Sequence, residues 1–361
     1  MHVERLRIHR FRAYHETEWN PMPGINLVTG GNGAGKTTLL EALHLLANGR
    51  SFRGRVRDGL VQHGQADLEV FAEWSECEGR IRRAGLRHSG REWTARLDAE
   101  PVASLSALSA AFAVLTIEPG SHELIAGGSE KRRQFVDWAL FHVEPDFLVA
   151  WKRYTRALKQ RNALLKSRPL PALLEAWNFE MTESGESITR MRSYYLTQLE
   201  PLLARIAGVY LPEFGAVRLE FQPGWRRDEM SLDRALMQSM ERDRFLGHSS
   251  TGPHRADWRI AFERHPGRQS LSRGQQKLVA LCCVLAQGHS YAGLCGEWPV
   301  IALDDLASEL DREHQERVLE DVMGCEAQVL MTGTEIPESM RALESRFSRF
   351  HVEQGQVRRL V

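Results

Sequence analysis

The chain has 361 residues, of which 42% are hydrophobic, so it can bury a large core and is long enough for more than one domain. Its formal net charge is zero at pH 7, so contact with a polyanion requires a local basic patch rather than an overall positive field. The sequence has no run of about 18 apolar residues and no apolar core after a basic start. We therefore expect no membrane span and no secretion signal.

The cysteines favour a reducing compartment. They are odd in number, two are adjacent, and none are spaced as C-x-x-C: Cys77, Cys282, Cys283, Cys295 and Cys325. This pattern disfavours both a disulfide framework and a zinc site. We expect a cytoplasmic protein.

The first third of the chain has an α/β pattern, and the middle has a helical one. The first third predicts strands at 3–11 and 25–28, a glycine-rich loop at 29–36, a helix at 37–47, three antiparallel strands within 68–98 and a strand at 112–117. Residues 121–244 are mostly helical in pattern, with breaks at prolines 145, 169, 171, 201, 212 and 223.

The last third returns to an α/β pattern. It predicts a strand at 257–263, a helix at 272–291, a strand at 300–303, a helix at 312–323, a strand at 327–331 and a hairpin within 350–360 that turns near Gln354-Gly355. We therefore expect residues 1–118 and 246–361 to form one domain, with 119–245 inserted as a helical lobe.

Residues 30–37 fit the phosphate-loop pattern G-x-x-x-x-G-K-[ST]. The expected nucleotide-binding residues are Gly30, Gly31, Asn32, Gly33, Ala34, Gly35, Lys36, Thr37 and the following Thr38. Glycines let backbone N–H groups face phosphate oxygens, and the next helix adds its positive end. Lys36 is expected to reach the β- and γ-phosphates of ATP, and Thr37 to bind Mg²⁺. A chance glycine loop is disfavoured because a strand precedes it and an apolar-periodic helix follows.

An apolar strand at 299–303 ends in two acids, Asp304 and Asp305. This is the Walker B arrangement, in which the first acid holds the Mg²⁺ shell and the second orients an attacking water. Alone, the segment is also compatible with a strand that enters a polar turn, but the phosphate loop upstream favours an ATP site. Lys36, Asp304 and Asp305 are the candidate catalytic residues.

Residues 271–276 resemble the L-S-G-G-Q signature of ABC ATPases, with Arg273 in place of the first glycine. Ser272 stands at a helix start, where the helix dipole favours an anion. In ABC ATPases this element contacts the γ-phosphate held by the opposite subunit, which would make Ser272, Gly274 and Gln275 cofactor-binding residues. The segment is equally compatible with an ordinary helix N-cap. Residues 307–311 then resemble the D-loop.

The order of these motifs predicts an ABC/SMC-type P-loop ATPase head with an inserted mainly helical lobe, and it implies ATP-dependent head-to-tail dimerisation. Two departures bear on catalysis. Asp305 stands where a longer glutamate is usual, which predicts slow hydrolysis and leaves a non-hydrolysing nucleotide-binding module as an alternative. Residues 331–335 lack the usual switch histidine, for which Thr334 is a candidate substitute.

Two other classes are disfavoured. The spacing between phosphate loop and Walker B strand is too long for an ABC transport subunit. The proline-broken middle lacks the sustained heptads of a structural SMC protein. An SMC-like or other ABC-class ATPase switch stays open as an alternative.

Further segments resemble the bacterial RecF family. The start, Leu6-x-Ile8-x-x-Phe11-Arg12-x-Tyr14, resembles the opening of SMC-like and RecF-like ATPases; there Arg12 would touch phosphates and Tyr14 lie near the adenine, unless they serve packing and a solvated charge. More specific blocks lie at 49–53, 127–137 and 252–257, with Ser129 and Ala256 departing from the family pattern, and at 141–142 and 159–162.

The resemblance covers nearly the whole chain and implies a recombination mediator. RecF proteins bind ATP and DNA, dimerise, and work with RecR and RecO to place RecA at single-strand gaps, in gap repair, replication restart and SOS induction. It thus implies ATP with Mg²⁺, weak DNA-stimulated ATPase activity, DNA, RecR, RecO and indirectly RecA as partners, and no membrane.

Three basic clusters are candidates for a DNA surface. The favoured one contains no acid and consists of Lys152, Arg153, Arg156, Lys159, Arg161, Lys166 and Arg168. Lys152, Arg156 and Lys159 share one helical face, which suits phosphate contacts without base reading. A solvated helix face is the alternative. The other clusters are Arg53, Arg55 and Arg57, and Arg80, Arg82 and Arg83.

Overall fold

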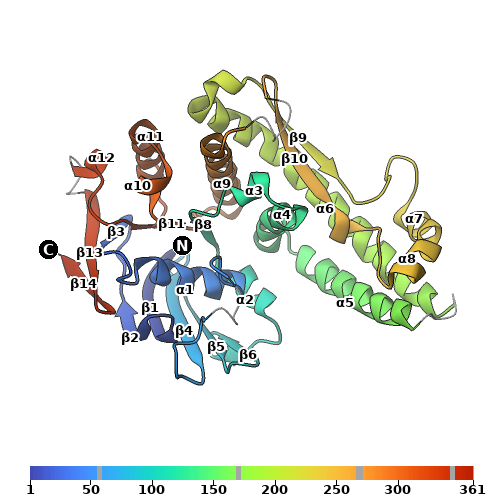
Figure 1. Cartoon of the computed structure of the whole chain (residues 1–361), viewed down its shortest axis with the longest axis horizontal. Helices are drawn as coiled ribbons and strands as arrows, with labels where there is room; N and C mark the ends of the chain where they lie inside the picture. Colours follow the sequence, from blue (N-terminus) through green and yellow to red (C-terminus); the bar gives the residue numbers. More distant parts are fainter. Residues whose placement is uncertain (55–58, 168–171, 266–270, 342–345, 361) are drawn as a thin grey trace. The chain divides into compact units, whose positions relative to one another are not determined.

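The computed structural model describes residues 1–54, 59–167, 172–265, 271–341 and 346–360 (Figure 1). These residues form two compact units. The first combines Met1–His122 with Arg273–Val361, and the second is Glu123–Ser272. The ends of the chain therefore build one unit, and the second is inserted in it.

The first unit contains an antiparallel sheet in its described residues. Its strand order is β2 (Tyr14–Trp19), β1 (His2–Phe11), β4 (Leu68–Ser75), β5 (Ile81–His88), β6 (Trp93–Leu97) and β7 (Glu100–Pro101). Alternate residues of β4 are buried, as expected for a strand with one face on the core. The short α2 (Leu105–Ala111) follows β7.

The second sheet of this unit carries the predicted nucleotide motifs. Its order is β14 (Gln356–Leu360), β13 (Phe347–Glu353), β3 (Ile25–Thr29), β12 (Val329–Thr332), β11 (Val300–Leu303) and β8 (Val114–Ile117). All neighbours are parallel except β13 and β14, which form the predicted hairpin around Gln354-Gly355. Every residue of β3, β11 and β12 is buried, which explains why β11 is a continuous apolar run and the other two strands are mostly apolar.

Helices fill the space around the parallel sheet. α1 (Lys36–Asn48) contacts β1, β4 and β5 of one sheet and β8 and β12 of the other, so it lies between the sheets. α9 (Arg273–Cys295), α10 (Leu306–Glu309) and α11 (Arg312–Met323) lie on the opposite side of the parallel sheet from α1 (Figure 1), and α12 (Glu338–Arg341) precedes β13. Gln328 joins the sheets, since its side-chain amide accepts from Val3 N (2.7 Å) and donates to Val3 O (2.9 Å).

α9 is long and apolar enough to cross a membrane by length and composition. However, 67% of its most apolar 18-residue window is buried inside the protein, and the helix packs on β8. Its apolar character therefore follows from its place in the core of the first unit.

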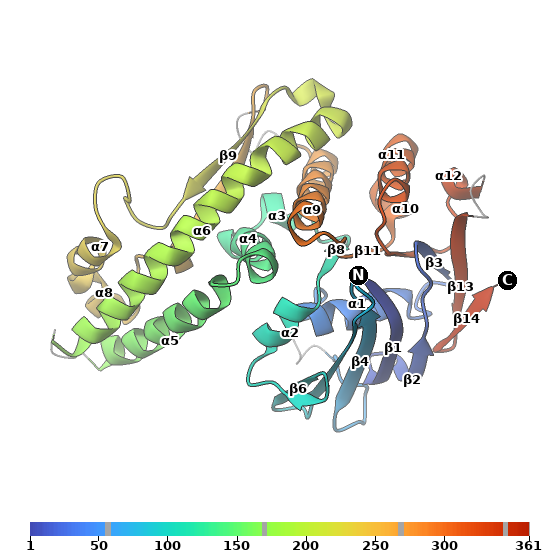
Figure 2. The ribbon, with the colours of Figure 1, turned by 180° about the vertical axis from the view of Figure 1, so that it is seen from behind.

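The second unit is mainly helical. It contains α3 (Glu123–Ala126), α4 (Ser129–Val143), α5 (Phe147–Lys166), α6 (Ala172–Tyr210), α7 (Leu232–Gln238) and α8 (Met240–Leu246), with 3₁₀ turns at Pro212–Phe214 and Pro253–Arg255. α5 and α6 run side by side (Figure 2). β9 (Val217–Gln222) and β10 (Asp257–Phe262) form an antiparallel pair that packs on α6 and α4.

Two details differ from the sequence predictions. Because β10 pairs with β9, residues 246–272 belong to the second unit, and the boundary lies at Ser272 rather than at residue 245. Alternation identifies a strand but not the sheet that it joins. Pro201 lies inside α6 rather than ending a helix. It is exposed, so water can hydrate the carbonyl group that loses its partner.

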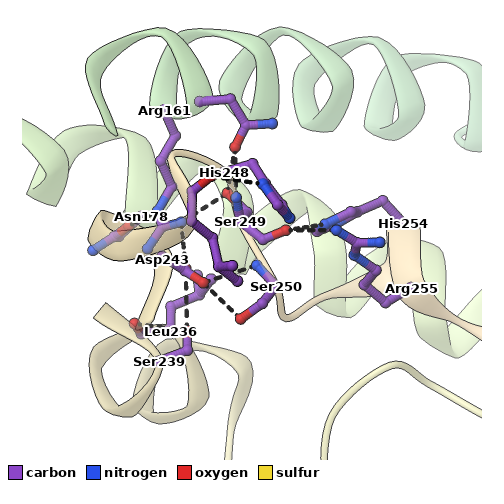
Figure 3. A network of polar contacts seen from close by, with 12 residues as sticks. Arg161, Asn178, Leu236, Ser239, Asp243, His248, Ser249, Ser250, His254 and Arg255 are labelled. Atoms are coloured by element: carbon purple, nitrogen blue, oxygen red, sulfur yellow. Dashed lines mark hydrogen bonds and ion pairs between the residues drawn. The ribbon is translucent and has the colours of Figure 1, made fainter. Parts of the chain in front are cut away.

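A buried polar network holds α8 against α5 and α6 (Figure 3). Arg161 donates from Nη1 to Asp243 Oδ2 and to Ser249 Oγ, both at 2.7 Å, and from Nε to Asn178 Oδ1 at 2.7 Å. The Arg161 and Asp243 side chains are both fully buried. Ser250 completes the site by donating from N and Oγ to Asp243 Oδ1.

The network extends to the segment 252–257. His254 Nδ1 lies 2.6 Å from Tyr154 Oη, and His254 Nε2 lies 3.0 Å from Ser249 O. Since a carbonyl only accepts, Nε2 carries the proton and the tyrosine donates to Nδ1. Burial lowers the pKa of His254 to about 4, so the ring is neutral at pH 7. The motif blocks at 159–162 and 252–257 thus meet in the core of this unit.

Arg161→Ala is expected to destabilise the second unit by about 3–5 kcal/mol, because it leaves Asp243 buried without a counter-charge. Lys159→Ala, an exposed cation two residues earlier on α5, is the control and should change the free energy of unfolding by less than about 0.5 kcal/mol. Urea denaturation of both variants measures the difference. Equal stability of the two variants would contradict a structural role for the ion pair.

Candidate functional site

The loop between β3 and α1 occupies the carboxyl edge of the parallel sheet, and two of its glycines are required by close packing. At Gly30, with φ of +150°, a Cβ atom would collide with the backbone oxygen of Val352. At Gly35, with φ of +109°, it would lie 2.8–3.0 Å from the ring of Tyr14. The phosphate loop is thus held between β13 and the start of β2, in a shape that side chains would prevent.

Tyr14 packs against this loop at Gly35. Its ring is buried, and its hydroxyl donates to Gly35 O at 3.1 Å. Burial raises the pKa of Tyr14 well above its ordinary value, so the hydroxyl stays a donor. The contacts of Tyr14 support its packing role, and its proximity to an adenine stays a prediction.

Lys36 and Thr37 begin α1 at the mouth of the loop. Lys36 Nζ donates to Gly30 O at 2.8 Å and to Gly31 O at 2.9 Å, which places the ammonium group across the loop. Partial burial lowers the pKa of Lys36, while the nearby carboxylates of Asp305 and Asp304 act in the opposite direction. The positive charge of Lys36 therefore lies beside the backbone of the phosphate loop.

Asp304 directly follows β11 and brings three segments together. Its Oδ1 accepts from Thr37 Oγ1 at 2.9 Å and from Thr332 Oγ1 at 2.7 Å, although Thr37 is 267 residues away in sequence. The side chain is buried, and this burial raises the pKa of Asp304 against the lowering effect of both hydroxyls. Mg²⁺ prefers oxygen ligands such as a carboxylate and a hydroxyl. The positions of Asp304 and Thr37 are therefore compatible with their predicted role as metal ligands.

Asp305 follows in a left-handed conformation, with φ of +51° and ψ of +44°, at the start of α10. Its N–H donates to Thr332 Oγ1 at 3.0 Å, and its Oδ2 accepts from Ser308 Oγ at 2.7 Å. A non-glycine residue is held in this region only where its surroundings compensate the strain. The second acid is therefore fixed to the predicted D-loop.

A cavity of about 570 Å³ opens beside the phosphate loop, within the size range of ligand pockets. Its described lining includes Gly33, Gly35, Lys36, Thr37, Thr38, Arg12, Arg53 and His63. Arg12 lines this cavity, and its guanidinium donates from Nη2 to Glu41 Oε1 at 2.6 Å. Glu41 is fully buried in α1 and also accepts from Ser51 and Arg53.

Glu41 and Thr332 are site residues that the sequence predictions missed. Glu41 lies among the apolar positions of α1, and an acid there is a signal that a cation lies opposite. Thr332 ends the strand next to β11, where a hydroxyl can reach the Walker B acid. Thr334, the predicted substitute for the switch histidine, is exposed, and Thr332 holds the contact to Asp304 instead.

The signature residues lie at the start of α9. Ser272 and Gly274 are exposed. Gly274 and Gln275 are not among the described residues that line the cavity beside the phosphate loop. Further along α9, Lys277 pairs with Glu309 of α10 at 2.6 Å, which joins the signature helix to the D-loop.

The cations of the favoured basic cluster differ in burial and in pairing. Arg161 is buried in its ion pair, so its assignment to a DNA surface is wrong, and Arg153 pairs with Glu180 of α6 at 3.0 Å. Arg168 lies outside the described residues. The remaining cations are exposed on one face of α5 and form no ion pair with a described residue: Lys152, Arg156, Lys159 and Lys166. We call these four residues the α5 stripe.

The other two basic clusters have fewer described cations that are free to contact DNA. Arg82 pairs with Glu76 and Asp98, and Arg83 pairs with Glu73. Arg55 and Arg57 lie outside the described residues, and Arg53 faces the cavity beside Glu41. The α5 stripe is therefore the strongest remaining basic surface of the three.

Comparisons with known proteins agree over the whole length. The family model for the RecF/RecN/SMC N terminal domain matches residues 2–358. The DNA replication and repair protein RecF of Xanthomonas euvesicatoria pv. vesicatoria is 58% identical over 99% of both chains. The protein of the same name from Shewanella baltica is 36% identical over 99% of both chains.

Solved structures show the same fold. One described as the recombination mediator protein RecF-ATP in the RecFOR pathway has a TM-score of 0.89 at 24% identity, covering 100% of this chain and 98% of that one. The Smc head domain from Pyrococcus furiosus has a TM-score of 0.58 at 14% identity, covering 99% and 96%. These likenesses support the ABC/SMC-type head that the motif order predicts.

Asp304→Asn is expected to raise the melting temperature at pH 7. Because the folded pKa of Asp304 is raised, its ionised form costs stability, and this cost grows as pH rises from the ordinary aspartate pKa through the folded one. The gain should vanish near pH 4. Thermal unfolding without nucleotide or metal measures it.

Asp311→Asn is the control of opposite sign. A backbone hydrogen bond from His314 lowers the pKa of Asp311, so its ionised form stabilises the fold. This variant should lose stability at pH 7 or leave it unchanged, never gain. A melting temperature for Asp304→Asn below that of the wild type at pH 7 would contradict the burial argument.

Proposed function

The chain belongs to the RecF family of DNA replication and repair proteins, and from this premise we propose that it is an ATP-dependent DNA-binding switch. The observation that carries the proposal is the contact of Thr37, Asp304 and Thr332 at the phosphate loop. It joins the two halves of a Walker-type site from segments far apart in the chain. A protein with a chance glycine loop would have no reason to bury a carboxylate there.

The proposed nucleotide contacts follow from this geometry. The backbone of residues 30–35, with Lys36 and Thr38, binds the phosphates of ATP, and Arg12 lines the same cavity. Thr37 and Asp304 hold Mg²⁺, which when bound neutralises charge on the β- and γ-phosphates. Glu41 keeps the Arg12 guanidinium oriented, since both its oxygens accept from that side chain.

Hydrolysis is proposed to be slow. Asp305 is the candidate for orienting water, but it is shorter than glutamate and its Oδ2 accepts from Ser308. A slow ATPase acts as a switch whose bound state lasts, rather than as a motor. A module that binds ATP and never hydrolyses it is the alternative, and single-turnover hydrolysis with and without DNA discriminates the two.

The complete site is proposed to form between two chains. Ser272, Gly274 and Gln275 of one chain would contact the γ-phosphate held by the phosphate loop of the other. The exposure of Ser272 and Gly274 supports this arrangement, because they are accessible to a second copy. A head-to-tail pair of this kind has two equivalent ATP sites and closes as a symmetric dimer.

Family membership supplies the proposed partners. RecR and RecO, and through them RecA, would act with this protein at single-strand gaps, in replication restart and in SOS induction. A structural SMC role is disfavoured, since α5 and α6 form a short helical pair and not an extended coiled coil.

Sedimentation with ATP and Mg²⁺, with and without a gapped duplex, tests the composite site. The wild type should form dimers that require ATP. Ser272→Arg should stay monomeric, because a bulky cation displaces the signature hydroxyl. Thr197→Arg, an exposed position on α6, is the matched control and should dimerise normally. If the wild type stays monomeric on and off DNA, the composite site is rejected and only a nucleotide-binding protein of unknown task remains.

The α5 stripe is the proposed DNA backbone contact, and its salt dependence tests this. Replacing Lys152, Arg156 and Lys159 by alanine should weaken duplex binding and lower the slope of log affinity against log salt by about 0.9 for each phosphate that the protein no longer neutralises. Arg153→Ala is the control, because this cation on the same helix is already paired with Glu180. Fluorescence anisotropy at several salt concentrations measures the slope. An unchanged slope in the triple variant would move the DNA surface elsewhere.

A further inference from the structure

Thr332 lies at a central place in the parallel sheet. It is the last residue of β12, the strand between β3 and β11. β3 leads into the phosphate loop, and β11 leads into the two acids Asp304 and Asp305. Since the three strands are parallel, their carboxyl ends lie at one edge of the sheet. The end of β12 therefore lies between the two halves of the predicted ATP site.

The hydroxyl of Thr332 contacts both acids. Its Oγ1 lies 2.7 Å from Asp304 Oδ1 and 3.0 Å from the backbone nitrogen of Asp305. A hydroxyl has one proton to donate, and a backbone N–H can only donate. The proton of Thr332 therefore goes to the Asp304 carboxylate, while the same oxygen accepts from Asp305. Because the side chain is only 3% exposed, water has little access to compete for either bond.

For Asp304, this bond fixes the rotation of the carboxylate. Thr37 also donates to Oδ1, at 2.9 Å, so two hydroxyls hold the same oxygen. The other oxygen, Oδ2, receives no hydrogen bond from a described residue. Thr37 belongs to the loop that a nucleotide would contact, whereas Thr332 ends a strand whose four residues are all buried. Thr332 therefore supplies the support that does not depend on the ligand.

For Asp305, the bond holds an unusual backbone conformation. This residue has φ of +51° and ψ of +44°, in the left-handed region that a non-glycine residue keeps only where its surroundings compensate the strain. Its N–H donates to Thr332, and its Oδ2 accepts from Ser308 Oγ at 2.7 Å. Loss of the Thr332 hydroxyl would leave this N–H without its acceptor. One side chain thus holds the carboxylate of the first acid and the backbone of the second.

A second threonine in this sheet shows how such a hydroxyl is satisfied without an acid. Thr29 ends the neighbouring strand β3, is also buried, and donates to the backbone carbonyl of Phe350 at 3.1 Å. That bond satisfies the hydroxyl within the sheet. Thr332 instead donates to a buried carboxylate. Its partners therefore indicate a role in the site in addition to one in the fold.

We propose that Thr332 is a positioning residue of the ATP site, whose hydroxyl orients Asp304 for Mg²⁺-dependent nucleotide binding and fixes Asp305 at the start of α10. This inference rests on the proposed function and deepens it, because it gives the end of β12 a part in the site. Thr332 acts only through the two acids. Its loss should therefore reduce the contribution of Mg²⁺ to nucleotide affinity and leave the contacts of the phosphate loop intact.

The test measures the affinity of a fluorescent ATP analogue, mant-ATP, in EDTA and in Mg²⁺; we call the ratio of the two affinities the Mg²⁺ gain. Thr332→Val keeps the branched shape and removes the hydroxyl. In EDTA its affinity should stay within about twofold of the wild type, since Lys36 and the loop backbone are unchanged. Its Mg²⁺ gain should fall by about tenfold, the lower end of what a hydrogen bond to a charged group contributes. Thr332→Ser should recover most of this gain.

A second measurement needs no nucleotide. Hydrogen exchange of residues 304–310, followed by mass spectrometry, reports on the bond from the Asp305 N–H. Exchange should be faster in Thr332→Val than in the wild type and should return to the wild-type rate in Thr332→Ser. A threonine that only filled space would give the opposite order, because valine keeps its volume and serine does not.

Thr116→Val is the matched control. Thr116 lies in β8, which flanks β11 on its other side, and its Oγ1 lies 2.9 Å from His44 Nδ1 rather than from an acid. This variant loses a hydroxyl hydrogen bond in the same sheet, yet it should keep both the Mg²⁺ gain and the exchange rate of residues 304–310. Thr334→Val, which removes an exposed hydroxyl, should do the same.

Three results would overturn the inference. A Mg²⁺ gain in Thr332→Val equal to that of the wild type would mean that Asp304 needs no support from β12. A loss that Thr332→Ser does not restore would mean that Thr332 acts by packing. An equal loss in Thr334→Val would place the role at that residue. In each case, a wild type that binds the analogue more tightly with Mg²⁺ would still support the proposed ATP site. Failure of the wild type to bind the analogue in either condition would reject the proposed function itself.

Discussion

The hydrogen bond between Thr37 and Asp304 is the contact on which the arrangement of the first unit depends. It ties the start of α1 to the end of β11, across a separation in sequence that includes the whole second unit. Thr332 adds the end of β12 to the same carboxylate oxygen. Because parallel strands place their carboxyl ends at one edge, a single acid can collect loops from three strands. Burial disfavours the ionised form of this carboxylate, so the residue lowers the stability of the fold. Its position is better explained by ligand binding than by stability.

From Asp304 a continuous set of contacts leads to the signature helix. Asp305 donates to Thr332 and accepts from Ser308, which lies in α10. The next residue, Glu309, forms an ion pair with Lys277 one turn inside α9. The ATP site and the start of the signature helix are therefore connected through α10 by short polar contacts within one unit. A dimer that closes on both elements would find them already fixed relative to each other.

Sequence patterns predict the first unit well because its elements carry strong local signals. Fully buried strands such as β11 are continuous apolar runs, the loop before α1 has a glycine at each tight position, and α11 begins at an Asp311 cap. Contacts between distant residues carry no such signal. The sheet that β10 joins and the hydroxyl of Thr332 that meets Asp304 depend on which segments become neighbours in space.

The sequence around Arg161 contains a sign that this residue is buried, but the local run of cations led to the opposite prediction. It lies in a run of cations without an acid, which predicted a surface position. Yet it follows Ala150, Tyr154 and Ala157 at the spacing of a buried helix face, and Leu165 continues that face. Periodicity therefore indicated burial, and the counter-charge came from Asp243, 82 residues away. A charged residue in phase with an apolar face is better treated as half of an ion pair than as surface.

The same reasoning accounts for a neutral protein with a surface suited to a polyanion. Arginines dominate the cations, and in the second unit several form ion pairs that hold the lobe together: Arg132 with Asp257, Arg161 with Asp243, and Arg192 with Asp137. Buried pairs of this kind fix one arrangement more than they add stability. The α5 stripe consists mostly of lysines, which carry no ion pair with a described residue. A net charge of zero is therefore compatible with a local basic surface, because acids paired with arginines elsewhere in the described residues do not offset the charge of the α5 stripe.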